Sequence, residues 1–148
     1  MATARGEAAF AFHHVNAFED ADGLVIDMIA YPDAKIIEEL YLARLRAGTL
    51  IDATGTLTRF RMTLGADAEV TRETLAPVSL ELPRINYEAH AGKPHRYVWG
   101  TGIQVPGDFL DSVVKIDTES GSAARWYERG CYPRRAGLRT GAVRQRRG

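Results

Sequence analysis

Two adjacent histidines, His13 and His14, stand in an apolar segment near the start of the chain. An imidazole ring can bind a metal ion, transfer a proton near neutral pH, or pack in a core with its nitrogens hydrogen-bonded. Because successive side chains of a β-strand point to opposite faces, only one of the two rings can face a given site. The pattern leaves both interpretations open, a core residue or a metal ligand, and does not decide between the two rings.

The segment that carries these histidines has the pattern of a β-hairpin. Residues 12–20 lead into Asp22 and Gly23, a dipeptide typical of tight turns between antiparallel strands. The apolar residues 24–31 then form the returning strand. The histidines are therefore expected on the first strand of the fold.

The rest of the first 127 residues is predominantly β by pattern. Residues 34–46 have apolar positions at helical spacing and predict a short helix. Further strands are expected at residues 56–64, 69–75, 96–102, 111–118 and 122–127. Pro77 and Pro83 predict a loop with short extended pieces between the second and third of these. Short strands separated by turns are typical of a sandwich, a barrel or a propeller, and the pattern does not choose among them.

Size and composition indicate one small globular unit. The chain has 148 residues, of which 45% are hydrophobic and 26% charged. No apolar stretch approaches the ~20 residues of a membrane-spanning helix, and no signal-peptide pattern opens the sequence. The single cysteine, Cys131, excludes an internal disulfide and is typical of a reducing compartment. We therefore expect a cytoplasmic protein with no integral membrane segment.

The zero net charge conceals a strong asymmetry. Residues 1–128 contain 12 basic and 19 acidic side chains, whereas residues 129–148 contain seven arginines and no acidic residue. Residues 134–148 have no helix or strand period and are expected to be disordered, as are residues 1–9. One interpretation of this tail is a basic arm for nucleic acid. The other, translation in a shifted reading frame, is favoured because no aromatic residue is interleaved for base stacking, and no nucleic-acid partner is expected.

Two motifs in their order and spacing resemble a known family. The run Phe-His-His-Val-Asn-Ala-Phe-Glu-Asp at 12–20 and the run Glu-Leu-Pro-Arg-Ile-Asn-Tyr at 81–87 resemble the carotenoid cleavage oxygenases. That family includes the retinal-pigment-epithelium isomerase and the lignostilbene dioxygenases. The resemblance covers about residues 10–133 and implies a mainly all-β fold. It would be a partial seven-bladed β-propeller, from the C-terminal half of the family's fold, with about two to three blades and a short helical insert.

The resemblance also implies a chemistry and its residues. In the family, four histidines hold Fe(II) on the propeller axis, and O₂ is added across a conjugated C=C bond of a carotenoid, apocarotenoid or stilbenoid. By this resemblance His13 is a metal ligand, and Glu81 is the carboxylate that orients a ligand imidazole. The family's other three ligands have no counterpart here, because His90 and His95 fall where the family has none, and both are expected in solvent.

An incomplete set of ligands predicts a chain that is inactive by itself. One imidazole does not hold Fe(II) tightly. This chain does not supply the missing blades, and blades without their neighbours are expected to be marginally stable. An alternative is a non-catalytic β-rich binding module, or a truncated remnant without metal. Metal analysis separates these alternatives from the enzyme fragment.

Overall fold

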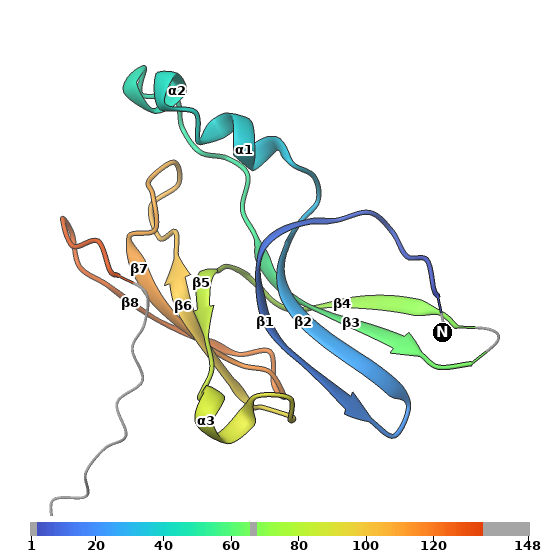
Figure 1. Ribbon diagram of the computed structural model, residues 1–148. Helices are drawn as coiled ribbons and strands as arrows, with labels where there is room; N and C mark the ends of the chain where they lie inside the picture. The colour runs from blue at the N-terminus through green and yellow to red at the C-terminus, as the bar shows by residue number, and fades with distance from the viewer. Residues whose placement is uncertain (1–2, 66–67, 135–148) are drawn as a thin grey trace, which may run out of the picture.

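The computed structural model describes residues 3–65 and 68–134, which fold into two four-stranded antiparallel sheets (Figure 1). The first sheet has the order β1-β2-β3-β4 and the second the order β5-β6-β7-β8. In each sheet every strand pairs with the next strand along the chain, which is the meander from which propeller blades are built. The strands are β1 (Phe10–Asp20), β2 (Gly23–Tyr31), β3 (Thr56–Thr63), β4 (Val70–Ser79), β5 (Glu81–Arg84), β6 (Tyr97–Gly102), β7 (Ser112–Asp117) and β8 (Ala123–Tyr127). This architecture confirms the expected partial propeller, with two blades.

The two sheets share one apolar core, and β1 contacts β5 where they meet (Figure 1). Leu80, which is fully buried, is the single residue between the outer strand β4 of the first sheet and β5 of the second. The core includes buried side chains from both sheets, among them Val15, Ile29, Leu57, Ile85, Val98, Val114 and Ile116. Because the apolar side chains of both sheets pack together, each sheet depends on the other for burial.

The expected hairpin is present, and it is irregular around the histidines. His13 lies opposite Ile29 and His14 opposite Met28, with a register shift on each side of the pair. Such bulges re-aim side chains and are frequent next to functional sites. The turn lies at Ala21 and Asp22, one residue before the predicted Asp22–Gly23 turn, and Gly23 begins β2.

The helical segment differs from the prediction of a single helix. It forms two short helices, α1 (Lys35–Glu39) and α2 (Leu42–Arg46), because the backbone of Tyr41 is extended (φ −62°, ψ 130°). Ile36 of α1 packs in the core. The buried carboxylate of Glu39 accepts hydrogen bonds from the backbone N–H groups of Asp52 and Ala53, at 3.0 and 2.8 Å. Glu39 thus ties the segment that returns from α2 to the end of α1.

Pro77 and Pro83 lie within strands, so the prediction that they belong to a loop with short extended pieces is wrong in part. Pro77 is in β4 and Pro83 in β5, and the strand register shifts at both places. A proline has no N–H to donate, and a bulge is where a sheet tolerates that loss. The structure therefore keeps the strands and disrupts their ladders locally.

Several expectations about the ends of the chain stay predictions. Residues 3–9 precede β1, and Glu7 lies 3.5 Å from Arg72 of β4 as an ion pair. The expected disordered tail falls outside the described residues, apart from Arg134. Within residues 3–65 and 68–134, no helix is long and apolar enough to cross a bilayer.

Gly100 of β6 is required by the close approach of β5. A Cβ at this position would lie 2.6 Å from the backbone oxygen of Glu81 and 2.6 Å from a methyl carbon of Leu80. We expect Gly100→Ala to lower the free energy of unfolding by about 1–3 kcal/mol, because the backbone of Glu81 must shift. Urea denaturation measures the change. The control is Ala124→Ser on the exposed strand β8, expected to stay within about 0.5 kcal/mol of wild type. Equal stability of Gly100→Ala and wild type would contradict the packing.

Candidate functional site

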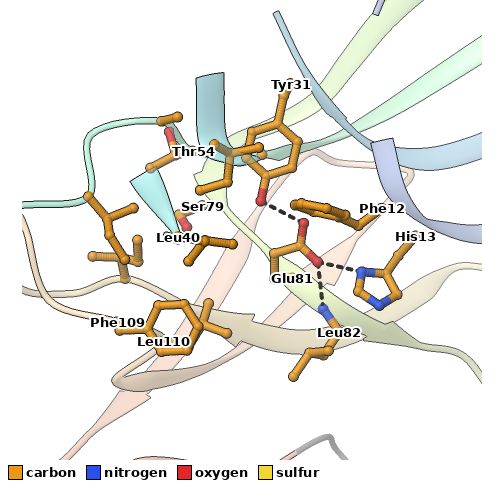
Figure 2. Close-up of a pocket in the computed structure, with 15 residues that line it drawn as sticks. Phe12, His13, Tyr31, Leu40, Thr54, Ser79, Glu81, Leu82, Phe109 and Leu110 are labelled. Carbon is orange, nitrogen blue, oxygen red and sulfur yellow. Dashed lines mark hydrogen bonds and ion pairs between the residues drawn. The ribbon is translucent and has the colours of Figure 1, made fainter. Parts of the chain in front are cut away.

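The structure brings His13 and Glu81 together, from strands 68 residues apart in the sequence. His13 Nδ1 lies 2.6 Å from Glu81 Oε2 across the contact of β1 with β5 (Figure 2). The His13 side chain is 34% exposed, whereas that of Glu81 is 11% exposed. The bulges beside His13 and the shifted register of β5 turn the two side chains toward each other.

Two further groups fix the carboxylate of Glu81. The hydroxyl of Tyr31 donates to Oε1 at 2.6 Å, and the backbone N–H of Leu82 donates to Oε2 at 3.1 Å (Figure 2). Leu82 has a positive φ of 49°, an uncommon conformation for a leucine. Burial, followed by the hydrogen bond to Glu81 and its charge, raises the pKa of Tyr31 far above its ordinary value, so this hydroxyl remains a donor. The carboxylate is therefore held by donors from β1, β2 and its own strand.

The ring of His13 has one nitrogen engaged and one directed elsewhere. Nδ1 faces the carboxylate, so Nε2, on the opposite side of the ring, is the nitrogen that can bind a metal (Figure 2). His14 is exposed, as expected for the neighbouring residue on a strand. The structure thus distinguishes the two histidines, which the sequence pattern did not.

A cavity of about 250 Å³ lies beside this pair. Its lining is mainly apolar and comes from both sheets, from α1 and its neighbouring residues, and from the loop between β6 and β7. Phe12, Tyr31 and Leu40 face Phe109 and Leu110 across it (Figure 2). Glu81 is its one carboxylate, so the cavity offers an apolar surface with a single charged group beside His13.

The prediction that His95 faces solvent is wrong. Its side chain is 1% exposed and lies 3.4 Å from the fully buried Asp27 of β2, because the segment before β6 turns inward against the first sheet. His90 ends the short helix α3 (Tyr87–His90) and is half-buried, with Nδ1 2.8 Å from the backbone oxygen of Pro94. Neither ring reaches the cavity beside His13.

Sequence reasoning missed Tyr31 and Asp27 as partners of the site and its surroundings. Asp27 had a visible signal, since it occupies a core-facing position in the alternation of β2. Its charge is balanced by Arg59, which donates from Nε and an NH₂ group at 2.8 Å each. Tyr31 had no signal, because an aromatic residue at a strand end is an ordinary core residue.

The residues present fit one ligand of a metal centre rather than a whole centre. His13 and Glu81 form the arrangement in which a carboxylate fixes a ligand imidazole. In the part of the chain that is placed, no three His, Cys, Asp or Glu side chains are grouped closely enough to hold a metal ion. The expected role of His13 is thus compatible with the geometry, and the remaining ligands are not in this group.

The hydroxyl of Tyr31 provides a direct test of how Glu81 is held. We expect Tyr31→Phe to lower the free energy of unfolding by about 1–3 kcal/mol, because Glu81 Oε1 loses its donor while it stays buried. Tyr41→Phe removes a hydroxyl from a side chain whose residue is 59% exposed, and serves as the control in the same urea titration. If the two variants were equally stable, the Tyr31–Glu81 hydrogen bond would contribute nothing.

Comparison with known proteins identifies relatives of this chain. The family model described as retinal pigment epithelial membrane protein matches residues 2–136. Human β,β-carotene 15,15'-dioxygenase is 33% identical to the chain, over 86% of the chain and 28% of that protein. The carotenoid isomerooxygenase of Galleria mellonella is 31% identical, over 87% of the chain and 26% of that protein. The chain thus spans about a quarter of the length of these relatives.

Solved structures agree with the sequence relatives. The crystal structure of cobalt-substituted Synechocystis apocarotenoid oxygenase has a TM-score of 0.66 and 26% sequence identity to the chain, covering 81% of the chain and 25% of that structure. The two sheets therefore correspond to a part of that protein's fold. With a family match over nearly the whole sequence, the chain belongs to the retinal pigment epithelial membrane protein family, which is the family of carotenoid oxygenases.

Proposed function

We propose that this chain is the part of an Fe(II)-dependent carotenoid-cleaving dioxygenase that supplies one iron ligand and the carboxylate that orients it. The observation that carries the proposal is the 2.6 Å contact between His13 Nδ1 and Glu81 Oε2. It leaves Nε2 of His13 facing away from the carboxylate. Cleavage of a carotenoid is the activity named for relatives such as human β,β-carotene 15,15'-dioxygenase and the torulene dioxygenase of Fusarium fujikuroi.

The hydrogen bonds support a role for each residue. Glu81 is held by Tyr31 and Leu82, so it accepts the Nδ1 proton of His13 in one fixed direction. The imidazole is thereby kept in the tautomer whose Nε2 carries a lone pair. Ferrous iron bound by neutral imidazoles keeps its full charge and open positions for O₂, which is the chemistry the metal supplies. Glu81 itself is not a ligand in this proposal, since its oxygens are occupied by three donors.

The cavity beside His13 supports a polyene or a stilbenoid as the substrate class. Its wall is formed by aliphatic and aromatic side chains, including Phe12, Leu40 and Phe109, which suit a hydrocarbon chain and exclude water. The names of the relatives favour a carotenoid over a stilbenoid. We propose that this wall is one side of the substrate site, and that O₂ is the second substrate.

One imidazole is not sufficient for the reaction. Around His13, the described residues provide no second or third ligand. We therefore propose that the 148-residue chain by itself does not cleave carotenoids, and that the other ligands belong to the blades found in the longer relatives.

Binding of Co²⁺ to the chain tests the role of His13 and Glu81. In an NMR titration at pH 7.5, we expect paramagnetic broadening first at the His13 ring and at cavity residues such as Phe12 and Leu82. Glu81→Gln should weaken this binding about tenfold, because the carboxylate no longer fixes the ring. His14→Ala is the matched control and should leave it unchanged. Equal broadening at both histidines, or no effect of Glu81→Gln, would sink the proposal.

A chimaera tests the whole reaction. Residues 10–133 would replace the aligned segment of human β,β-carotene 15,15'-dioxygenase, and β-carotene cleavage would be followed by aldehyde formation. We expect activity in the chimaera and in its His14→Ala variant, and a loss of at least about 100-fold for His13→Ala. A folded chimaera whose His13→Ala variant keeps its activity would exclude His13 as a ligand.

A further inference from the structure

A buried polar cluster joins the two sheets away from the cavity. His95 comes from the connection between α3 and β6 of the second sheet, and its ring is inserted against the first sheet. There it lies beside Asn16 of β1 and Asp27 of β2, and Asp27 in turn is bound by Arg59 of β3. The Phe18 and His95 rings are nearly perpendicular, with their centroids 6.2 Å apart. The carotenoid-cleaving role proposed above uses none of these groups.

The backbone fixes the orientation of the Asn16 amide. Its Oδ1 accepts from Gly92 N at 3.1 Å, and its Nδ2 donates to His90 O at 3.0 Å and Lys93 O at 2.9 Å. The same Nδ2 lies 3.2 Å from Nδ1 of His95, so its two hydrogens are shared among three acceptors. Since an amide nitrogen only donates, Nδ1 of His95 must present a lone pair. The network thereby assigns His95 as neutral, with its proton on Nε2.

The surroundings of Nε2 of His95 do not stabilise a positive charge on the ring. Nε2 lies 3.4 Å from Asp27 Oδ2 and is buried, without a hydrogen-bond partner among the described residues. Asp27 is fully buried, and both its oxygens already accept hydrogen bonds from Arg59 at 2.8 Å. An imidazolium here would therefore add a buried charge beside a carboxylate that the guanidinium has neutralised.

We propose that His95 is an acid-sensitive latch between the two sheets: the neutral ring holds the α3–β6 connection against β1, and protonation releases it. A proton on Nδ1 would face the NH₂ group of Asn16. That amide cannot turn over, because its reversed orientation would oppose all three of its backbone partners. Protonation thus converts an attractive contact into a repulsive one.

The charges around the ring act in the same direction. Burial is the largest cause that lowers the pKa of His95, and the positive charge of Arg59 and the nearby His90 lower it further. Asp27 alone opposes them. The group that faces the ring from β1 is the uncharged Asn16. Of the groups around His95, only Asp27 on β2 favours the protonated ring.

The latch acts on the strand that carries the candidate ligand. Asn16 follows His13 by three residues on β1, so release of the latch frees this strand near its contact with Glu81. This consequence rests on the proposed function, whereas the latch between the sheets does not.

The direction of the pH effect follows from the lowered pKa. The unfolded chain, with an ordinary histidine pKa near 6.5, takes up the proton before the folded chain does. The stability that the latch contributes is thus complete above about pH 6.5 and is lost as the pH falls toward the folded pKa. Between pH 7.5 and 5.5 the unfolding equilibrium constant should rise through His95, by at most about tenfold, the limit that the unfolded pKa near 6.5 sets.

NMR of the imidazole nitrogens of the 148-residue chain tests the assignment without a mutation. We expect His95 at pH 7.5 as the neutral tautomer with the proton on Nε2, persisting below pH 6.5. A proton on Nδ1 at pH 7.5, or a titration midpoint at or above 6.5, would overturn the latch.

Urea unfolding at pH 7.5 and 5.5 tests its energetic effect. His95→Phe retains a ring of similar size but does not titrate, so the contribution of His95 should disappear from the pH dependence of unfolding. His14→Ala, on the exposed side of β1, should keep it. An unchanged pH dependence in His95→Phe would overturn the latch. The Co²⁺ titration at pH 7.5 is independent of this result, so the two proposals can fail separately.

Discussion

The buried carboxylate of Glu81 is the interaction on which the arrangement of the two sheets around His13 depends. Taking a carboxylate out of water is costly unless its oxygens receive hydrogen bonds. Glu81 receives them from His13, Tyr31 and the backbone of Leu82, so β1, β2 and β5 must all be in place at once. The hydrogen bonds that the Glu81 carboxylate requires therefore couple the first sheet to the second. They also orient the imidazole ring of His13.

Strand β1 links the sheets a second time, through Asn16 and the buried His95. The two contacts differ in chemistry. At Glu81 a carboxylate receives hydrogen bonds from several donors. At His95 a neutral ring lies between the amide of Asn16 and the carboxylate of Asp27, whose charge Arg59 neutralises. Because both involve the same strand, the position of His13 depends on buried polar groups as well as on the apolar core.

The cavity beside His13 indicates which class of ligand this geometry suits. An apolar wall next to a single oriented imidazole suits a hydrocarbon substrate near a metal, in a family whose named members cleave carotenoids. The chain spans about a quarter of those relatives, and its described residues contain no group of three metal-binding side chains. In the function proposed above, His13 is therefore one ligand, and the remaining ligands belong to other parts of the longer relatives.

The sequence by itself determined the hairpin, the strands outside the segment of Pro77 and Pro83, and the family, because alternation, turn residues and the two motifs at 12–20 and 81–87 are local signals. It also singled out His13 and Glu81, through resemblance. Tyr31, the burial of His95 and the strands that contain Pro77 and Pro83 were decided by the tertiary structure. These features depend on contacts between residues far apart in the chain, as the contact of His13 with Glu81, 68 positions apart, also does. A local pattern does not record which donor reaches a buried charge, since only the packing of two sheets brings the donor there.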